Sequence, residues 1–435
     1  MSPKTWIISV NMGYGHQRTA FPLKELAPGG KIICANDYEG IPAGDKKIWE
    51  TTREGYEFIS RIKRIPLLGQ GIFLFFDQVQ KIFSFYPKKD LSKPNFQLKQ
   101  IFSLIKNGWG KDLILRLGAS TDLSRMSSGQ VEKPLPLIGT FFTPVFMAEY
   151  FNYPGEIFCV VCDADISRTW APLDPKTSRI KYFAPNARVV ERLKLYGVNP
   201  KNVFLTGYPL PQELTGDEKL ETLKNDLEHR LLNLDPNKKY FSYYEPLIKK
   251  HLGDLPGKSN HILTLMFAVG GAGTQKEIGV KIVKSLIKRI KNKEIKVILV
   301  AGTRKEVKEY FEKTIQNQDV EILFGENIES YFQKFNQTLK QTDILWTKPS
   351  ELSFYSALGL PIIIAPPVGS QEEFNRRWLL NAGFGESQGN PDYTNQWLFD
   401  WLDKGYLAER AMQGFIEGEK LGTFKIKEII AKCSG

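Results

Sequence analysis

The sequence predicts an α/β protein built from two open parallel sheets in tandem, each covered by helices on both faces. Three observations carry this prediction. Short apolar strands alternate with helical stretches along most of the chain, a pattern typical of parallel sheets. A glycine-rich turn follows the first strand of each half, and 435 residues exceed what one core of usual size accommodates.

The first sheet is predicted from apolar runs bounded by turns and charged helices. Its expected strands are residues 5–10, 31–35, 111–117, 137–141, 156–162, 181–184 and 202–206. Residues 48–85 are predicted to be mostly helical and are unusually rich in aromatic side chains. A turn-rich stretch at 206–211 ends this domain, which we place at residues 1–212.

A charged helical segment, residues 213–260, is predicted as a linker or insertion before the second sheet. The expected strands of that sheet are residues 262–269, 296–301, 320–324, 343–346 and 362–365. The second domain is placed at 261–410, and a C-terminal helix at 411–435 completes the chain, in an arrangement where the last helices can cross back to the first domain.

The turn at residues 11–16 follows the first strand of the chain. Gly13 and Gly15 permit close approach to the backbone, and His16 falls near the start of the next helix. An imidazole that titrates near neutrality can take a proton from an acceptor hydroxyl, so His16 is the candidate catalytic base. The alternative is a tight strand–helix turn with a surface histidine. A dinucleotide motif would need glycine at Arg18.

The second glycine-rich turn contains Gly270, Gly271 and Gly273, between a predicted strand and a helix at 275–290. Its backbone N–H groups, with a helix N-terminus behind them, suit a phosphate. No Gly-Lys-Ser/Thr sequence follows, which excludes a P-loop. The alternative is a flexible turn without a ligand.

Residues 347–375 are the most informative stretch of the chain. A turn leads into a short helix, a strand at 362–365 follows, and a polar loop opens another helix carrying Gln371, Glu372 and Asn375. Two helix N-termini and several hydroxyl-binding side chains therefore fall at the carboxyl edge of one strand. A pyrophosphate fits one end and a polyhydroxylated group the other, which indicates a nucleotide-sugar in a cleft between the domains.

Composition narrows the partners and the compartment. A net charge of +11 favours acidic partners, but we find no nucleic-acid recognition motif. The spacing of Cys159 and Cys162 falls in an apolar strand, where alternate side chains face opposite ways, so we expect no redox or metal chemistry there. The N-terminus does not resemble a signal peptide and no apolar run reaches the length of a membrane span, which favours a reducing cytoplasm.

Two further stretches leave alternatives open. Asp163 and Asp165 form an Asp-x-Asp pair, for which loop capping and cleft lining are favoured over a metal site. Trp170 can stack on an apolar acceptor or fill a core. Residues 61–89 mix basic and aromatic side chains, which suits either an anionic lipid interface or a buried helix pair with snorkelling lysines.

Taken together, these motifs resemble the glycolipid-forming enzymes of the GT-B glycosyltransferase fold. Examples are monogalactosyldiacylglycerol synthase, processive diacylglycerol glucosyltransferase and, more distantly, the N-acetylglucosaminyltransferase that makes lipid II. The resemblance covers most of the chain except residues 216–260. It rests on segments 13–16, 160–170, 182–186, 207–209, 270–273, 347–349 and 371–375.

The resemblance implies roles for these residues. The donor diphosphate would lie on Gly270, Gly271, Gly273 and residues 350–353, and the sugar on the polar side chains of the last loop. The implied donor-binding set is Gly270, Gly271, Gly273, Thr347, Ser350, Glu351, Ser353, Gln371, Glu372 and Asn375. On the acceptor side, the implied set is Gly13, Gly15, Asp163 and Trp170, with His16 facing the acceptor.

The sequence departs from the family pattern at two places. The family usually has Gly-Gly where this chain has Ser350 and Glu351, and a ribose-binding Glu where this chain has Ser356. A carboxylate at Glu351 can repel the donor phosphates. The family histidine between the aspartate and the tryptophan is also absent, and Ser167 and Arg168 occupy that loop.

The sequence therefore predicts an inverting, metal-independent glycosyltransferase that uses a nucleotide-sugar, with UDP-sugar favoured, and a lipid or lipid-like acceptor. No cofactor, no metal and no nucleic acid are expected, and the enzyme would work in the cytoplasm or at the inner membrane face. A second hypothesis is a catalytically silent relative that binds a nucleotide-sugar or a partner. A nucleotide-sugar epimerase shares the fold, but residues 163–170 and the membrane-like segment argue against it.

Overall fold

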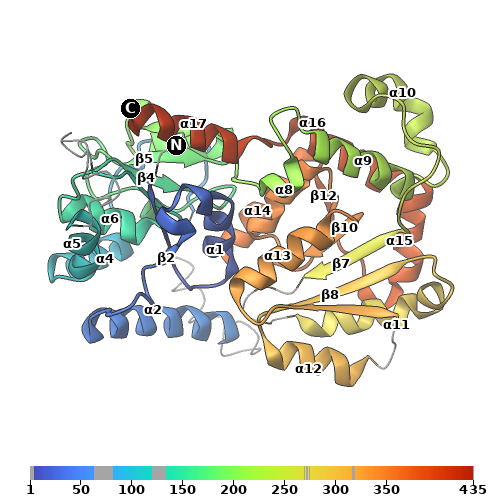
Figure 1. The fold of residues 1–435 in the computed structure, drawn as a ribbon, viewed down its shortest axis with the longest axis horizontal. Helices are drawn as coiled ribbons and strands as arrows, with labels where there is room; N and C mark the ends of the chain where they lie inside the picture. Colours follow the sequence, from blue (N-terminus) through green and yellow to red (C-terminus); the bar gives the residue numbers. More distant parts are fainter. Residues whose placement is uncertain are drawn as a thin grey trace. The chain divides into compact units, whose positions relative to one another are not determined.

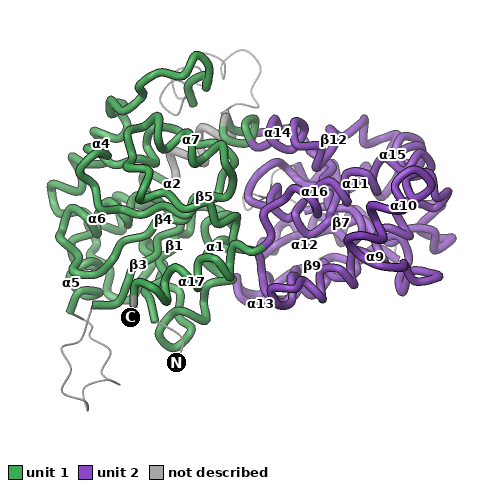
Figure 2. The backbone as a smooth tube through the Cα atoms, turned by 90° about the horizontal axis from the view of Figure 1, so that it is seen from above, with its two compact units in different colours: residues 1–209, 368–374, 421–435 green, residues 210–367, 375–420 purple. Residues whose placement is uncertain are grey.

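The computed structural model describes residues 4–62, 82–119, 134–268, 270, 273, 275–315 and 319–434. Gly271 and most of the predicted interfacial segment 61–89 lie outside the described residues. The chain divides into two compact units (Figure 2). Unit 1 comprises residues 1–209, 368–374 and 421–435, and unit 2 comprises residues 210–367 and 375–420. Within the described residues, no helix combines the length and apolar character of a membrane span.

Unit 1 contains a six-stranded sheet in which every strand pairs parallel to its neighbour, in the order β2-β1-β3-β4-β5-β6. The strands are β1 (Trp6–Ser9), β2 (Ile33–Cys34), β3 (Leu137–Gly139), β4 (Ile157–Val160), β5 (Lys181–Ala184) and β6 (Val203–Leu205). The central strands are continuous apolar runs because helices cover both faces of a parallel sheet. The order in which the strands are added to the sheet reverses between β1 and β3.

In sequence, the helices of unit 1 lie between or after its strands, and α17 follows unit 2 (Figure 1). They are α1 (Tyr14–Ala20), η1 (Phe21–Leu26), η2 (Pro28–Gly30), α2 (Ala43–Ile62), α4 (Phe96–Lys106), α5 (Lys111–Ala119), α6 (Phe142–Tyr150), η4 (Arg168–Trp170), α7 (Ala187–Leu195), η5 (Pro200–Asn202) and α17 (Gly422–Ser434). Asn95 and Asn186 cap α4 and α7 by accepting a hydrogen bond from the backbone three residues on.

The prediction of a strand at 111–117 was wrong, because these residues belong to helix α5. Leu113, Ile114 and Leu117 are the buried side chains of this helix and lie on one face. Asp112 and Arg116, one turn apart, form an ion pair of 2.8 Å on the helix surface. A short apolar run is compatible with either a buried strand or one face of a helix, and in this protein it forms the buried face of a helix.

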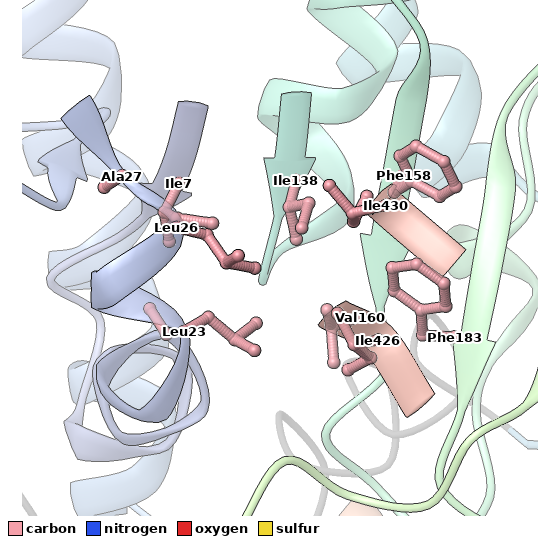
Figure 3. Packing of buried hydrophobic residues seen from close by; sticks show 11 residues of the cluster. Ile7, Leu23, Leu26, Ala27, Ile138, Phe158, Val160, Phe183, Ile426 and Ile430 are labelled. Carbon is pink, nitrogen blue, oxygen red and sulfur yellow. The ribbon is translucent and has the colours of Figure 1, made fainter. Parts of the chain in front are cut away.

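The core of unit 1 joins the start of the sequence to its C-terminal helix (Figure 3). Ile426 and Ile430 of α17 are fully buried against the sheet residues Phe158 and Phe183, whose rings stack at 5.0 Å. Leu23 of η1 belongs to the same cluster. Burying one isoleucine side chain contributes roughly 1.5–3 kcal/mol. The expected return of the C-terminal helix to the first domain is therefore confirmed.

Unit 2 contains a second six-stranded parallel sheet, in the order β12-β11-β10-β7-β8-β9. The strands are β7 (Thr264–Ala268), β8 (Lys296–Gly302), β9 (Val320–Phe324), β10 (Ile344–Thr347), β11 (Ile362–Ile364) and β12 (Gly385–Ser387). Counted from β7 as the first strand, this is the order 3-2-1-4-5-6 of dinucleotide-binding sheets, which reverses between β7 and β10. Ligands of such sheets bind beyond the carboxyl ends of the strands at that point.

The helices of unit 2 surround this sheet. They are α8 (Gln212–Thr215), α9 (Glu221–Leu234), α10 (Lys239–Leu252), α11 (Lys276–Lys291), α12 (Lys305–Thr314), α13 (Ile328–Leu339), η6 (Glu351–Leu358), α14 (Ser370–Ala382), η7 (Pro391–Tyr393), α15 (Thr394–Asp403) and α16 (Tyr406–Glu417). Helix α14 begins in the 368–374 segment of unit 1 and continues into unit 2. The segment expected to be a helical linker is helical, and most of it forms α9 and α10 within unit 2.

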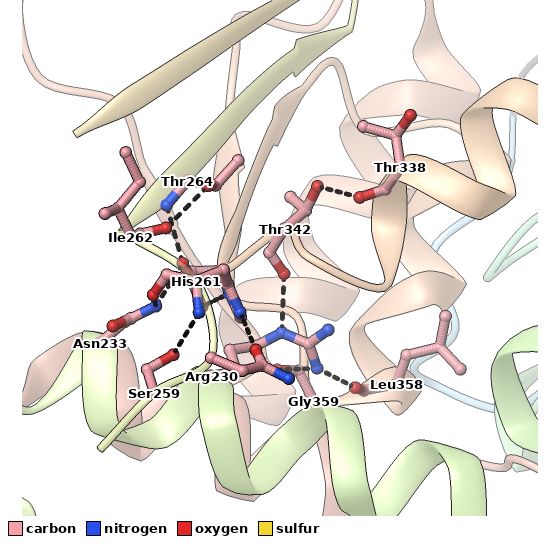
Figure 4. A network of polar contacts seen from close by, with 12 residues as sticks. Arg230, Asn233, Ser259, His261, Ile262, Thr264, Thr338, Thr342, Leu358 and Gly359 are labelled. Atoms are coloured by element: carbon pink, nitrogen blue, oxygen red, sulfur yellow. Dashed lines mark hydrogen bonds and ion pairs between the residues drawn. The ribbon is translucent and has the colours of Figure 1, made fainter. Parts of the chain in front are cut away.

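A buried polar network fastens α9 to the amino-terminal edge of the second sheet (Figure 4). The guanidinium of Arg230 donates to the carbonyl oxygens of Thr342 at 2.8 Å and Leu358 at 2.7 Å. The carboxylate of Asp343, fully buried, accepts from the Thr264 N–H at 2.7 Å and lies 3.1 Å from His261 Nε2. This network lies at the edge opposite to the one where parallel sheets bind ligands, so it serves the fold.

Candidate active site

In unit 1, the candidate site lies where β1 and β3 end. The turn after β1 is fixed by Asn36, whose side chain accepts from the Asn11 N–H at 2.8 Å and donates to the Asn11 carbonyl at 3.2 Å. Gly13 has a φ of 101°, a left-handed conformation that favours glycine. Gly15 lies in the first turn of α1, and its carbonyl accepts from the Thr19 hydroxyl at 2.7 Å. The turn is therefore tightly held.

His16 is clamped to the end of β3 by Thr140. Its Nδ1 lies 2.8 Å from the Thr140 carbonyl oxygen, and the Thr140 hydroxyl donates to the His16 carbonyl at 2.9 Å. A carbonyl oxygen only accepts, so Nδ1 carries the hydrogen of the neutral ring. In this tautomer Nε2 has the basic lone pair, the property that a general base requires. The thiol of Cys162 lies 3.5 Å from the same Nδ1.

Aromatic rings surround the His16 imidazole. The ring of Phe141 lies 4.7 Å away and that of Trp170 6.5 Å away, measured between ring centroids. Trp170 also contacts Phe142 at 5.3 Å and is only 3% exposed. Of the two alternatives for Trp170, the structure favours core packing, since this ring presents almost no surface.

The Asp-x-Asp pair divides into two roles. Asp165 is buried and forms a two-point ion pair with Arg192, with both N–O distances at 2.8 Å. It also accepts from the Ile166 N–H at 2.9 Å, so this carboxylate holds its own loop. Asp163 is half-buried at the end of the β4 segment, on the same loop as Cys162. Loop capping is therefore the observed role of Asp165.

Arg168, which replaces the family histidine, is a buried structural residue. Its guanidinium donates to the carbonyl oxygens of Ser92 at 2.6 and 2.9 Å, Ala171 at 2.7 Å and Pro172 at 3.0 Å. Burial lowers the pKa of this guanidinium from its usual value. The loop that carries Trp170 is thus fixed by the Arg168 side chain.

In unit 2, the candidate site lies where β7 and β10 end. The Gly273 N–H donates to the Gly270 carbonyl at 2.8 Å, and Gly273 has a φ of 63°, so these residues close a tight turn. A Cβ on Gly270 would lie 2.3 Å from Cε of Lys348, and one on Gly273 would lie 3.3 Å from Cδ of Arg304. Two basic side chains therefore pack on the two glycines.

The loop after β10 is held largely by its own contacts. The Thr347 hydroxyl contacts the Ala268 carbonyl at 3.3 Å, and the Ser353 N–H donates to the Ser350 carbonyl at 2.9 Å. Ser350 and Lys348 are half-buried, whereas Ser353 is fully buried. Within the described residues, the Ser353 hydroxyl has no hydrogen-bond partner.

Glu351 and Ser356 occupy the positions where the sequence departs from the family. The Glu351 side chain is 8% exposed at the start of η6. The Ser356 hydroxyl, fully buried, donates to the Ser353 carbonyl at 2.8 Å. A Cβ on Gly414 of α16 would lie only 2.3 Å from the Ser356 carbonyl oxygen, so α16 covers this part of η6 closely. Ser356 does not take the place of a ribose-binding carboxylate.

The polar residues of α14 make local contacts. Glu372 turns back on its own loop and accepts from the Val368 N–H at 2.6 Å. The Asn375 side-chain amide, fully buried, donates to the Pro349 carbonyl at 3.2 Å and so ties α14 to the loop after β10. Gln371 is half-buried in the first turn. Asn375, predicted to bind a sugar, is thus a buried contact of the loop after β10.

The structure adds four residues that sequence reasoning did not assign to the site: Thr140 and Cys162 beside His16, and Lys348 and Arg304 beside the glycine turn. The only clue to these four residues in the sequence was their position, because each follows the carboxyl end of a strand. Among the described residues, no group of three or more His, Cys, Asp or Glu side chains is placed to hold a metal ion.

The sequence of this chain is similar to one family of domains and to several characterised proteins. Residues 257–337 match a domain of unknown function (DUF6938). The chain is 24% identical over 258 residues to the processive diacylglycerol beta-glucosyltransferase of Bacillus subtilis, covering 58% of this chain and 56% of that protein. It is also 24% identical over 264 residues to the enzyme of the same description from Bacillus licheniformis, covering 58% and 57%. The chain thus spans little more than half the length of these curated relatives.

Among solved structures, the glycotransferase of kitacinnamycin is similar over 100% of both chains, with 13% identity and a TM-score of 0.49. These figures describe a distant likeness, and the fold assignment rests on the strand order of the two sheets. The chain therefore has two Rossmann-like parallel sheets, as in the GT-B fold, and resembles the diacylglycerol glucosyltransferases in sequence.

Proposed function

We propose that this protein transfers a sugar from a nucleotide diphosphate sugar, with UDP-sugar favoured, to a lipid or lipid-like acceptor. One observation carries the proposal. The second sheet reverses between β7 and β10, and the glycine turn and the loop after β10 meet at that carboxyl edge. The similarity to diacylglycerol glucosyltransferases supports a lipid acceptor.

The donor would bind at this edge of unit 2. Backbone N–H groups of Gly270 and Gly271 would face the diphosphate, and Ser350 and Glu351 would border it. Gly273 would shape the turn, since its N–H donates to the Gly270 carbonyl. The predicted sugar contacts Gln371 and Glu372 fall in the 368–374 segment, which belongs to unit 1. The remaining predicted donor residues are Thr347, Ser353 and Asn375. All three are buried and two of them contact backbone carbonyls, so they would support the loops that bind the donor.

The acceptor would be activated by His16. Its Nε2 would take the proton of the acceptor hydroxyl while that oxygen attacks the anomeric carbon and the bond to the diphosphate breaks. A single displacement inverts the anomeric configuration. Fixed N–H dipoles would stabilise the negative charge on the leaving diphosphate, which makes a metal unnecessary in this scheme. Gly13, Gly15 and Asp163 are the proposed acceptor contacts, with Trp170 supporting the ring of Phe142 behind them.

Peripheral membrane binding on the cytoplasmic side is part of this proposal. The described end of the aromatic and basic segment supports it, since Phe83 is 40% and Tyr86 70% exposed. The guanidinium of Arg188 lies 3.9 Å from the centre of the Phe85 ring. Exposed aromatic rings beside cations suit the headgroup region of an anionic bilayer.

A catalytically silent relative that binds a nucleotide-sugar or a partner is the second candidate. The observation that favours it is Ser356, which is buried under α16 and supplies no carboxylate for a ribose. This candidate predicts nucleotide binding without turnover.

The deciding experiment incubates the purified protein with radiolabelled UDP-sugars and mixed lipids, with labelled lipid as the readout. His16→Gln should lower transfer by about 10²–10⁴-fold. His251→Gln, on α10 of unit 2, is the matched control and should retain the rate. Nucleotide binding with no labelled lipid from any donor would select the silent relative. Full turnover in His16→Gln would remove His16 from the mechanism.

A further inference from the structure

Two cationic side chains border the glycine turn of unit 2, and one of them, Lys348, occupies space that only a glycine leaves open. A Cβ on Gly270 would lie 2.3, 3.1 and 3.2 Å from Cε, Cδ and Nζ of Lys348. The end of the lysine side chain therefore lies directly across the Gly270 backbone. Any larger residue at position 270 would displace it.

Arg304 approaches the other end of the same turn. A Cβ on Gly273 would lie 3.3 Å from its Cδ and 3.9 Å from its Nε. Arg304 is the residue before α12 and also pairs with Glu306 at 3.1 Å, with its side chain 36% exposed. The guanidinium is thus anchored near the turn and still open to solvent on one side.

The two basic residues come from different strand ends. Lys348 follows β10 and Arg304 follows β8, while the turn itself follows β7. These are neighbouring strands, in the order β10-β7-β8, so their carboxyl ends place one cation on each side of the turn. This is the chemistry of a site for a doubly charged anion, because two cations lie beside the same turn.

We propose that Lys348 and Arg304, with Gly270 and Gly273 between them, form a diphosphate clamp. The inference rests on the proposed function, and it adds two residues and a reason for the glycine at position 270. The ammonium and the guanidinium bind the phosphate oxygens of a nucleoside diphosphate and neutralise the charge that builds up when the sugar leaves. Specificity for the diphosphate over the nucleoside comes from this clamp.

The test compares UDP, UMP, inorganic pyrophosphate and uridine by titration calorimetry, with Lys348→Gln, Arg304→Gln and the double variant. Each single variant should weaken UDP binding by roughly 10- to 100-fold, the range for one hydrogen bond to a charged group. Uridine affinity should change by less than about 2-fold, because a neutral nucleoside gains little from a nearby charge. Raising the salt concentration should weaken UDP binding more in the unaltered protein than in the double variant.

The matched control is Lys296→Gln, at the amino-terminal end of β8, where the ammonium pairs with Glu321 at 2.7 Å. It removes one positive charge from the strand that leads to Arg304 and should leave UDP affinity unchanged. Lys348→Arg should restore part of the loss. Unfolding midpoints without ligand show whether each variant is folded.

The outcomes distinguish the proposal of a diphosphate clamp from the proposal of sugar transfer. Equal loss of UDP and uridine affinity in Lys348→Gln and Arg304→Gln would overturn the clamp, as would unchanged UDP affinity. Failure of the unaltered protein to bind UDP, GDP or pyrophosphate would overturn it too. Clamp-dependent UDP binding with no labelled lipid would keep the clamp and reject sugar transfer.

Discussion

The imidazole of His16 donates its Nδ1 hydrogen to the carbonyl oxygen of Thr140, 2.8 Å away and 124 residues further along the chain. The same two residues share a second hydrogen bond, from the Thr140 hydroxyl to the His16 carbonyl. A main-chain acceptor thus orients the candidate base, where many enzymes use a carboxylate. The orientation depends on how β1 and β3 pair, since each residue follows one of these strands.

This contact predicts the tautomer of His16. In protein labelled with ¹⁵N only at histidine, the neutral ring of His16 should carry its hydrogen on Nδ1 and not on Nε2. The chain has four histidines, so comparison with His16→Gln assigns the signal. Protonation at Nε2 in the neutral ring would contradict the 2.8 Å contact, because two lone pairs would then face each other.

Restoring the family carboxylate should not restore a ribose contact. We expect Ser356→Glu to destabilise the protein by about 3 kcal/mol or more, because a carboxylate would be buried under α16 without a partner. Ser356→Ala, which removes only the hydrogen bond to the Ser353 carbonyl, should cost about 1 kcal/mol. Urea unfolding measures both. A Ser356→Glu protein that is as stable as the original and binds UDP more tightly would show that η6 is more open than described.

The carboxylate of Asp343 should be among the most sensitive positions in unit 2. Asp343→Ala leaves the Thr264 N–H without its acceptor and removes one of the two acceptors of the Asn233 amide, and we expect a loss of about 3–5 kcal/mol. The control is Asp400→Ala, which breaks an exposed pair with Lys404 and should change stability by less than about 1 kcal/mol. Chemical denaturation compares the two, and a similar small effect for both would refute the role of the network.

Asp343 also predicts a dependence of stability on pH. Burial raises its pKa above the usual 3.8, although the nearby His261 acts in the opposite direction. Above pH 3.8 the native state therefore holds this proton longer than the unfolded state does. The protonated carboxyl of Asp343 therefore adds to the free energy of unfolding. This addition is complete below the pKa of the unfolded state and is lost as the pH rises through the pKa of the folded state. The free energy of unfolding of the original protein, minus that of Asp343→Asn, should fall as pH rises from about 4. A difference that rises with pH would mean that His261 dominates.

The C-terminal helix should be essential to unit 1. Ile430→Ala removes a fully buried side chain from the cluster with Phe158 and Phe183 and should cost about 2–5 kcal/mol. Lys432→Ala, two residues later and exposed, should change stability by less than about 0.5 kcal/mol. Thermal unfolding followed by aromatic circular dichroism tests this pair. An effect below 1 kcal/mol for Ile430→Ala would mean that α17 contributes little to the core.

Much of the fold could be predicted because strand and helix signals alternate clearly. Residues 181–184 and 320–324 were placed with the observed bounds, since each is an apolar or alternating run ended by polar residues. The strand predicted at 111–117 failed because a run of that length also makes one face of α5. The short edge strand β12 has only three residues and gave no periodic signal.

The site could be predicted only in part. The glycine turns and His16 were found because small residues and a scarce histidine stand out beside a strand. Lys348 was not found, since its role depends on the Gly270 backbone, 78 positions earlier in the sequence. Asn375 was expected to face a sugar, but its burial and its bond to Pro349 followed from packing that no local pattern encodes.

The packing of α17 into the core of unit 1 has a consequence for biosynthesis. Residues 422–434 leave the ribosome only after all of unit 2 has been made. Until then, the hydrophobic residues of unit 1 that pack against α17 stay exposed. Unit 2 interrupts unit 1 in sequence and can mature first, which reverses the order in which the two were translated. Chaperone demand during synthesis should therefore fall on the amino-terminal half.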